Sequence, residues 1–175
     1  MTKLLGISGS LRKGSYNSML VREAARVFGP DEFAFADMNL PLFNEDVEAE
    51  GIPASVETIT QQIIDADAIV ISTTEYNKGP SGVMKNMLDW VSRPRPAPMV
   101  GKPVAVLSAA AGGAGGQRAK SHMYLYLIPF KVNLVFNPEV NLGNAGACFD
   151  EDGKLTHEPT MKALEGLMAE LKAAI

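Results

Sequence analysis

Three short runs of this sequence are apolar at nearly every position, and they restrict the possible folds more than any other feature. The runs are Leu4 to Ser8, Ala68 to Thr73 and Val104 to Ala109. A strand with one solvated face alternates apolar and polar side chains, whereas a strand covered on both faces by helices does not. The runs therefore predict central strands of a parallel sheet that has helices on both faces.

Along the whole chain, segments with strand composition alternate with segments of helical periodicity. Two further runs, Phe33 to Phe35 and Val132 to Phe136, have the composition of strands. Helical periodicity covers Asn17 to Val27, Ser55 to Asp65, Ser81 to Ser92, Gln117 to Leu127 and Thr160 to Ala174. Five alternations of strand and helix predict a doubly wound α/β sheet with right-handed crossovers.

Composition narrows the class of protein. The 175 residues, 46% of them hydrophobic, suit one domain spanning residues 1–175. A net charge of -4 argues against a nucleic-acid surface, and no apolar run approaches the roughly 20 residues of a membrane-spanning helix. With one cysteine and no secretion signal visible, the expected compartment is the cytoplasm.

The loop after the first strand combines glycines with hydroxyl, amide and guanidinium side chains. It reads Gly9-Ser10-Leu11-Arg12-Lys13-Gly14-Ser15-Tyr16-Asn17-Ser18 and leads into a helix. Glycines let backbone N–H groups turn toward an anion, and a helix start favours negative charge. Arg12 adds a forked, permanently charged donor. The loop is predicted to bind a phosphate; a plain connection with an N-cap is the alternative.

Two more loops lie at the carboxyl ends of strands, where doubly wound sheets bind ligands. Thr74 to Gly79 suits a flat aromatic ligand, because Tyr76 offers a ring face and Asn77 can bond ring heteroatoms. The alternative is a solvated turn with Ser81 as the next N-cap. Ala109 to Gly116 has almost no side chains, so either its backbone N–H groups reach a ligand or it is a flexible linker.

Other phosphate-binding motifs are missing. The chain has no Gly-Lys-Ser/Thr of a P-loop and no Gly-x-Gly-x-x-Gly at the start of a helix. A phosphorelay receiver needs acidic residues where this chain has Ser8, Ser10 and Thr73. Nucleoside triphosphate hydrolysis and phosphorelay are therefore not expected.

Several of these residues occur together in a known family. The combination of Gly9-Ser10-Leu11-Arg12-x-x-Ser15-x-Asn17, Glu75-Tyr76-Asn77, Lys85-Asn86-x-x-Asp89-Trp90 and a later Gly-Gly loop resembles the NAD(P)H-dependent FMN reductases. That family includes quinone, chromate, azo and ferric reductases. The resemblance implies a flavodoxin-like, three-layer, five-stranded parallel sheet of order 2-1-3-4-5. It also implies tightly but non-covalently bound FMN, with NADH or NADPH as electron donor.

The resemblance assigns roles to individual residues. It implies that the FMN phosphate is held by Ser10, Arg12, Ser15, Asn17 and Ser18. It implies that the isoalloxazine ring is bordered by Glu75, Tyr76, Asn77 and Lys78 and flanked by Ser108, Gly112 and Gly113. Because the flavin carries the chemistry, no catalytic side chain and no metal site are expected.

Two cations are expected near the mouth of the site. Lys78 and Arg95, together with Tyr76, are candidates for binding the nicotinamide or an anionic acceptor, since positive charge attracts anions. The alternative is that both are solvated surface charges. The chain also departs from the common Pro-Glu-Tyr-Asn by Thr74, and from a frequent Pro-Gly by Ser81-Gly82.

The predicted function is reduction of a small acceptor, such as a quinone, chromate, an azo compound or a ferric complex. One open flavin face implies a ping-pong hydride mechanism in which the nicotinamide leaves before the acceptor enters. Two alternatives stay open: a flavodoxin-like electron carrier for protein partners, and a non-catalytic flavin-binding regulatory module.

An apolar stretch predicts self-association. Met123 to Phe130 is too hydrophobic around its circumference for a helix with one solvated face. With Met84, Met87 and Trp90 it is expected to form a two-fold interface beside the flavin, in a homodimer or a dimer of dimers. The alternative is that both faces belong to the core of a single chain.

Overall fold

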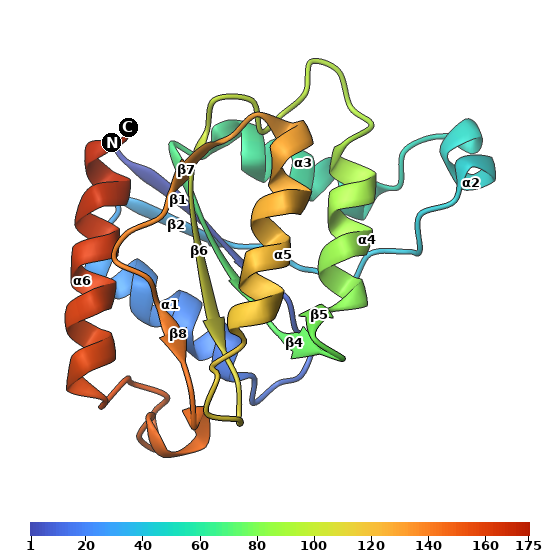
Figure 1. Ribbon diagram of the computed structural model, residues 1–175. Coiled ribbons are helices and arrows are strands. Elements are labelled where there is room, and N and C mark those ends of the chain that lie inside the picture. Colours follow the sequence, from blue (N-terminus) through green and yellow to red (C-terminus); the bar gives the residue numbers. More distant parts are fainter.

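A single six-stranded parallel sheet forms the centre of the computed structural model, which describes residues 1–175 (Figure 1). Its strands are β1 (Lys3–Ser8), β2 (Glu32–Phe35), β3 (Ala68–Thr73), β6 (Pro103–Ala109), β7 (Asn133–Val135) and β8 (Asn141–Leu142). The order is β2-β1-β3-β6-β7, and β8 also pairs with β6. The predicted doubly wound fold and its strand order 2-1-3-4-5 are confirmed.

The fifth strand position is divided between two short strands. β7 pairs with the start of β6, with Leu134 beside Val104, and β8 pairs with its end, with Asn141 beside Ser108. The sequence predicted only the first piece, because two residues are too few to show a strand period. The second piece extends the sheet to the carboxyl end of β6, where ligands of such folds bind.

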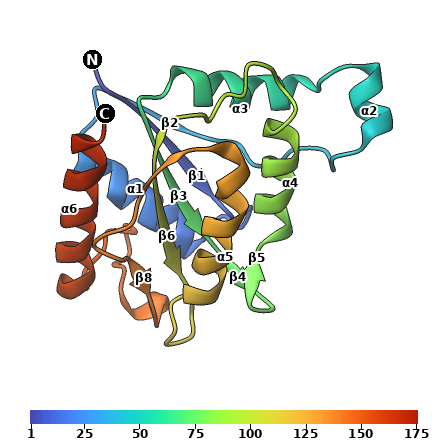
Figure 2. The same cartoon turned by 45° about the horizontal axis from the view of Figure 1, so that its top comes forward.

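Helices cover both faces of the sheet, so that the molecule has three layers (Figures 1 and 2). The long helices are α1 (Tyr16–Phe28), α3 (Ala54–Asp65), α4 (Gly82–Val91), α5 (Gln117–Leu127) and α6 (Glu158–Ala173). Neighbouring strand residues belong to different cores: Leu4 packs with the α1 and α6 side, and Leu5 with the α3, α4 and α5 side. The unbroken apolar runs are thereby explained. None of the helices is long and apolar enough to span a membrane.

The packing of Trp90 differs from the prediction. The sequence placed it in an interface between two chains, but it is fully buried within its own chain. Its indole N–H donates to the Pro41 carbonyl at 2.8 Å, and Phe43 packs edge-on against its ring at 5.0 Å. Asn86 donates to the same carbonyl at 2.9 Å. The segment before the short helix α2 (Glu45–Glu50) thus covers this side of α4.

Candidate active site

Three loops meet at the carboxyl ends of β1, β3 and β6 and enclose a pocket of about 400 Å³. The lining residues are Ser10, Arg12, Ser15, Tyr16, Asn17, Thr74, Glu75, Tyr76, Ala109, Ala110, Ala111, Gly112, Ala114, Gly115 and Gly116. We call Gly9 to Ser18 the phosphate loop and Ala110 to Gly116 the glycine loop. The pocket therefore lies at the edge of the sheet where the sequence predicted a ligand site.

The phosphate loop presents unpaired donors at the start of α1. Ser15 is the N-cap, and its Oγ accepts from the Ser18 N–H at 3.4 Å. The backbone N–H groups of Tyr16 and Asn17 donate to no acceptor within the chain. Arg12 is exposed, has no carboxylate partner, and stacks over the Tyr16 ring with its Cζ 5.3 Å from the centroid. Free amides at a helix start and an unpaired guanidinium fit the phosphate of FMN.

The three serines of the loop differ in where their hydroxyls lie. Ser10 accepts from the Arg12 N–H at 3.3 Å and lines the pocket, as Ser15 does. Ser18 donates to Ser8 at 2.9 Å and lines an adjoining hollow instead. Of the residues predicted to hold the phosphate, Ser18 alone is outside the pocket lining.

Asn17 ties the pocket together instead of offering its side chain to a ligand. Its Nδ2 donates to the Ala109 carbonyl at 2.9 Å and to Thr74 Oγ1 at 3.3 Å. Its Oδ1 accepts from Ser72 Oγ at 2.7 Å and from the Ala109 N–H at 3.0 Å. The amide is fully used, so that only the backbone N–H of Asn17 remains for a phosphate.

Glu75 caps α5 from a distant part of the chain. The N-cap residue Gly116 has no side chain, and Glu75 Oε2 accepts from the N–H groups of Arg118 at 3.1 Å and Ala119 at 3.2 Å. A carboxylate at a helix start is stabilised by the helix dipole. Glu75 lines the pocket, and its carboxylate joins the second loop to α5.

The second loop is a hairpin, which the sequence did not predict. β4 (Glu75–Tyr76) and β5 (Gly79–Pro80) pair antiparallel around Asn77 and Lys78, whose φ angles are 50° and 68°. Positive φ at both turn residues defines a type I′ turn, which favours Asn-Gly. Tyr76, 58% exposed, lines the pocket, whereas Asn77 and Lys78 form the exposed tip outside it.

The glycine loop is supported from below and from the side. Ser108 is fully buried, does not line the pocket, and donates to Asn141 Oδ1 at 3.0 Å. The Ala110 N–H donates to the Leu142 carbonyl at 3.0 Å. Gly112 lines the pocket, and Gly113 lies in the loop without lining it. The two ends of the loop are therefore packed on the fold, whereas Ala111 to Ala114 are exposed.

Arg95 does not line the pocket at the carboxyl edge. α4 starts beside the pocket and runs back along the sheet for ten residues, about 15 Å. Arg95 belongs to the segment between α4 and β6, and this segment lies at the amino edge of the strands (Figure 1). Its guanidinium donates to the carbonyls of Ser92, Arg93 and Pro94. A helix that connects two parallel strands runs back to their amino ends, which explains the position of Arg95.

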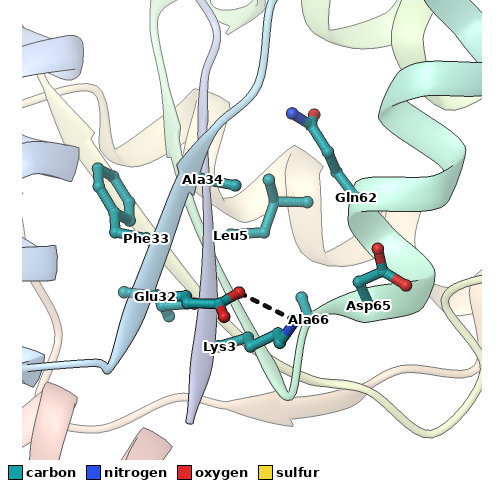
Figure 3. Close-up of a pocket in the computed structure, with 9 residues that line it drawn as sticks. Lys3, Leu5, Glu32, Phe33, Ala34, Gln62, Asp65 and Ala66 are labelled. Atoms are coloured by element: carbon teal, nitrogen blue, oxygen red, sulfur yellow. Dashed lines mark ion pairs between the residues drawn. The ribbon is translucent and has the colours of Figure 1, made fainter. Parts of the chain in front are cut away.

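A second pocket lies at the amino edge of the sheet, between β2 and α3 (Figure 3). Lys3 and Glu32 form an ion pair of 2.9 Å on one side, and Gln62 and Asp65 project from α3 on the other. The lysine of this pocket is paired with a carboxylate, and no helix begins in the pocket lining. The pocket therefore lacks the anion-binding donors found in the pocket at the carboxyl edge.

Tyr16 is a pocket residue that the sequence analysis did not single out. Its ring is stacked on Phe149, with centroids 6.1 Å apart and planes 2° apart, and Arg12 covers it. The tyrosine lies in the recognised loop, but nothing local distinguishes it from an ordinary core aromatic. The partner that holds it is far away in the sequence.

Comparison with known proteins places this site in a family. Residues 2–147 match the NADPH-dependent FMN reductases. The chain is 44% identical over 173 residues to an NAD(P)H-dependent FMN reductase of Pseudomonas aeruginosa, covering 98% of this chain and 92% of that one. It is 34% identical over 170 residues to a quinone reductase of Escherichia coli, covering 94% and 90%. The flavoenzyme NAD(P)H:(acceptor) oxidoreductase FerB from Paracoccus denitrificans superimposes with a TM-score of 0.89 at 28% identity, covering 99% and 96%.

The fold and the site define a flavodoxin-like oxidoreductase that works with FMN. The chain belongs to the NADPH-dependent FMN reductase family. Its cofactors are FMN and NAD(P)H, as the sequence predicted. Membership of this family favours an enzyme over the two alternative functions, an electron carrier and a non-catalytic regulatory module.

Proposed function

We propose that this reductase acts in the cytoplasm and passes electrons from NADH or NADPH to quinones, through FMN held at the carboxyl edge of the sheet. The observation that carries the proposal is the set of unpaired donors at one end of the pocket, Arg12 and the N–H groups of Tyr16 and Asn17. The names of several relatives support quinones as the acceptor class.

Two sides of the pocket bind different parts of FMN, one its phosphate and the other its ring. Arg12 and the first turn of α1 bind the phosphate, with Ser10 and Ser15 shaping the loop around it. Tyr76 and the glycine loop border the ring, where backbone N–H groups can meet its polar edge. FMN, when bound, accepts a hydride from the nicotinamide and returns electrons to the acceptor.

Tyr76 and Gly112 both line the pocket and are exposed, and we place the open side of the pocket between them. The donor and the acceptor use the same side, so that the nicotinamide leaves before the acceptor binds. Chromate, azo compounds and ferric complexes are proposed as further acceptors at this site. Lys78, at the tip of the hairpin, attracts anionic substrates without touching the bound cofactor.

An anaerobic absorption spectrum tests the proposal. We expect the purified protein to show the absorption bands of bound FMN. Addition of NADH or NADPH should bleach these bands, and stopped-flow mixing with a quinone should restore them. Steady-state double-reciprocal plots at several quinone concentrations are parallel. If both nicotinamides leave the flavin oxidised, the proposed reaction is wrong; intersecting lines would reject the ping-pong order alone.

We also propose a homodimer or a dimer of dimers, through a smaller surface than the sequence suggested. Met84, Met87 and Trp90 are completely buried within the chain and cannot contribute to an interface. Leu125 and Ile128, 61% and 64% exposed, form the apolar surface that remains beside the groove between α4 and α5. Light scattering of the unmodified protein and of Leu125→Lys tests this: a stable monomer at micromolar concentration contradicts it.

A further inference from the structure

The glycine loop is packed backbone against backbone on residues 141–143. A side chain on Gly115 would lie 2.7 Å from the carbonyl carbon of Asn141. A side chain on Gly143 would overlap the carbonyl oxygen of Gly113. Contacts this close leave the loop one shape, and residues 141–143 set it.

Asn141 is fixed in turn by a chain of polar contacts. Its Oδ1 accepts from Ser108 at 3.0 Å, and its Nδ2 donates to Glu139 Oε2 at 3.0 Å. The same carboxylate oxygen accepts from Lys120 Nζ at 3.1 Å. A continuous network therefore joins the end of β6, the start of β8 and the first turn of α5.

Lys120 occupies a position that is unfavourable for a cation. It is 1% exposed, and burial lowers the pKa of its ammonium group against the effect of Glu139. It is also the fourth residue of α5, near the positive end of the helix dipole. An aliphatic side chain would fill the same space without either penalty, so packing alone does not account for this lysine.

The direction of the side chain connects it to the site. Side chains on a helix tilt toward its N-terminus, and the glycine loop directly precedes α5. Glu139 links Lys120 to Asn141, because its carboxylate accepts hydrogen bonds from both. The rest of the Glu139 side chain faces solvent, and 54% of it is exposed. These hydrogen bonds lower the pKa of Glu139, so that the carboxylate stays charged and keeps both donors.

We propose that Lys120 is a positioning residue that, through Glu139 and Asn141, holds the glycine loop in the shape that binds the flavin ring. The inference rests on the proposed FMN site. It separates two functions within the pocket: Arg12 recognises the phosphate, and Lys120 maintains the surface for the ring.

The test compares Lys120→Met, of similar length without charge, with Lys102→Met. Lys102 is a matched control because it also fixes backbone, donating to the carbonyls of Ile64 and Ala66 at the amino edge of the sheet. Lys120→Met is expected to raise the dissociation constants of FMN and riboflavin about tenfold each, since both carry the ring. In the apoprotein of Lys120→Met, hydrogen exchange of the Gly112 to Gly116 amides is expected to accelerate. Lys120→Gln keeps a donor for Glu139, so it is expected to restore part of the flavin affinity and part of the protection from exchange.

Each outcome decides the proposal. Unchanged ring affinity and unchanged loop exchange in folded Lys120→Met would overturn it, and so would equal changes in Lys102→Met. If Lys120→Met does not fold, Glu139→Gln carries the same test, because that side chain is half exposed. If the unmodified protein binds neither flavin, the proposed function fails, while loop exchange in the apoprotein still decides the role of Lys120.

Discussion

The two loops that line the pocket together are held in different ways. The phosphate loop takes its shape from its own side chains, since Ser10 bonds the Arg12 N–H and Ser15 bonds the Ser18 N–H. The glycine loop has no such side chains and depends on residues 141–143 and on other distant segments. The turn of the first is closed by local bonds, with Asn17 tying its end to β3 and β6, and the second is a product of tertiary packing.

Because of this difference, substitutions in the two loops should affect flavin affinity and the free energy of unfolding differently. In the phosphate loop the Arg12 guanidinium, the proposed phosphate donor, is exposed and has no carboxylate partner, so that it can be removed without disturbing the fold. In the glycine loop the backbone that is proposed to meet the ring is in contact with its support. Substitutions there are expected to change both the flavin affinity and the free energy of unfolding.

The largest effect is expected at Asn17, which joins the two loops. Asn17→Ala leaves the Ser72 hydroxyl and both backbone groups of Ala109 without their partner in a buried place. Each such group costs about 1–3 kcal/mol, so the free energy of unfolding of the apoprotein should fall by about 3 kcal/mol or more in urea denaturation. Ser18→Ala removes one bond to Ser8 and should cost about 1 kcal/mol. Equal losses would mean that the loops are held independently.

The next effect concerns ligand affinity alone. Arg12→Ala should weaken FMN about tenfold to hundredfold, because a charge-assisted hydrogen bond contributes about 1.5–3 kcal/mol. Fluorescence titration of the apoprotein should show unchanged riboflavin affinity and an unchanged melting temperature. Arg95→Ala, at the opposite edge of the sheet, serves as the control. An equal loss for FMN and riboflavin would assign Arg12 to the ring instead of the phosphate.

The glycine loop should respond in the opposite way. Gly143→Ala places a Cβ against the Gly113 carbonyl, and overpacking of this kind costs about 1–3 kcal/mol. The melting temperature should fall, and FMN and riboflavin should weaken to the same extent. Gly82→Ala is the control, because a Cβ there meets nothing within 4 Å. A stable Gly143→Ala protein would show that the loop can move away from its support.

The smallest effect is expected at the cap of α5. Glu75→Ala removes the acceptor for two N–H groups and should cost about 1 kcal/mol of apoprotein stability. Glu75→Gln keeps an acceptor and loses the charge, so its stability should lie between those of the unmodified protein and Glu75→Ala. Thermal unfolding at low salt measures both. A neutral Glu75→Ala would contradict the cap.

Most of the fold could be predicted because its signals are local. Apolar runs at Leu4, Ala68 and Val104 mark the central strands, and the alternation with helices leaves few topologies. The phosphate loop was recognisable for the same reason, since its glycines, its serines and Arg12 are consecutive. The family could be recognised from that loop together with the Glu75-Tyr76-Asn77 segment.

Other features depended on contacts between distant residues. Trp90 is buried because Pro41 and Phe43 cover it, and no periodicity in α4 reports a covering segment. Arg95 was assigned to the mouth of the site from its charge alone, although a helix between two parallel strands returns to the amino edge of the sheet, away from the pocket. Lys120 gave no signal at all, since a lysine in a helix is ordinarily solvated.

The sequence by itself determined the strands, the pocket edge and the candidate donors for a phosphate, because each of these follows from residues adjacent in the chain. The strand order came from the family resemblance and is a pairing of distant segments. Only the tertiary structure decided which donors remain free, with the Asn17 side chain fully used and the amides of Tyr16 and Asn17 unpaired. It also decided that the glycine loop packs closely against residues 141–143. The physical reason is that hydrogen-bond partners and close backbone contacts come from segments brought together by folding, and these pairings leave no trace in local residue patterns.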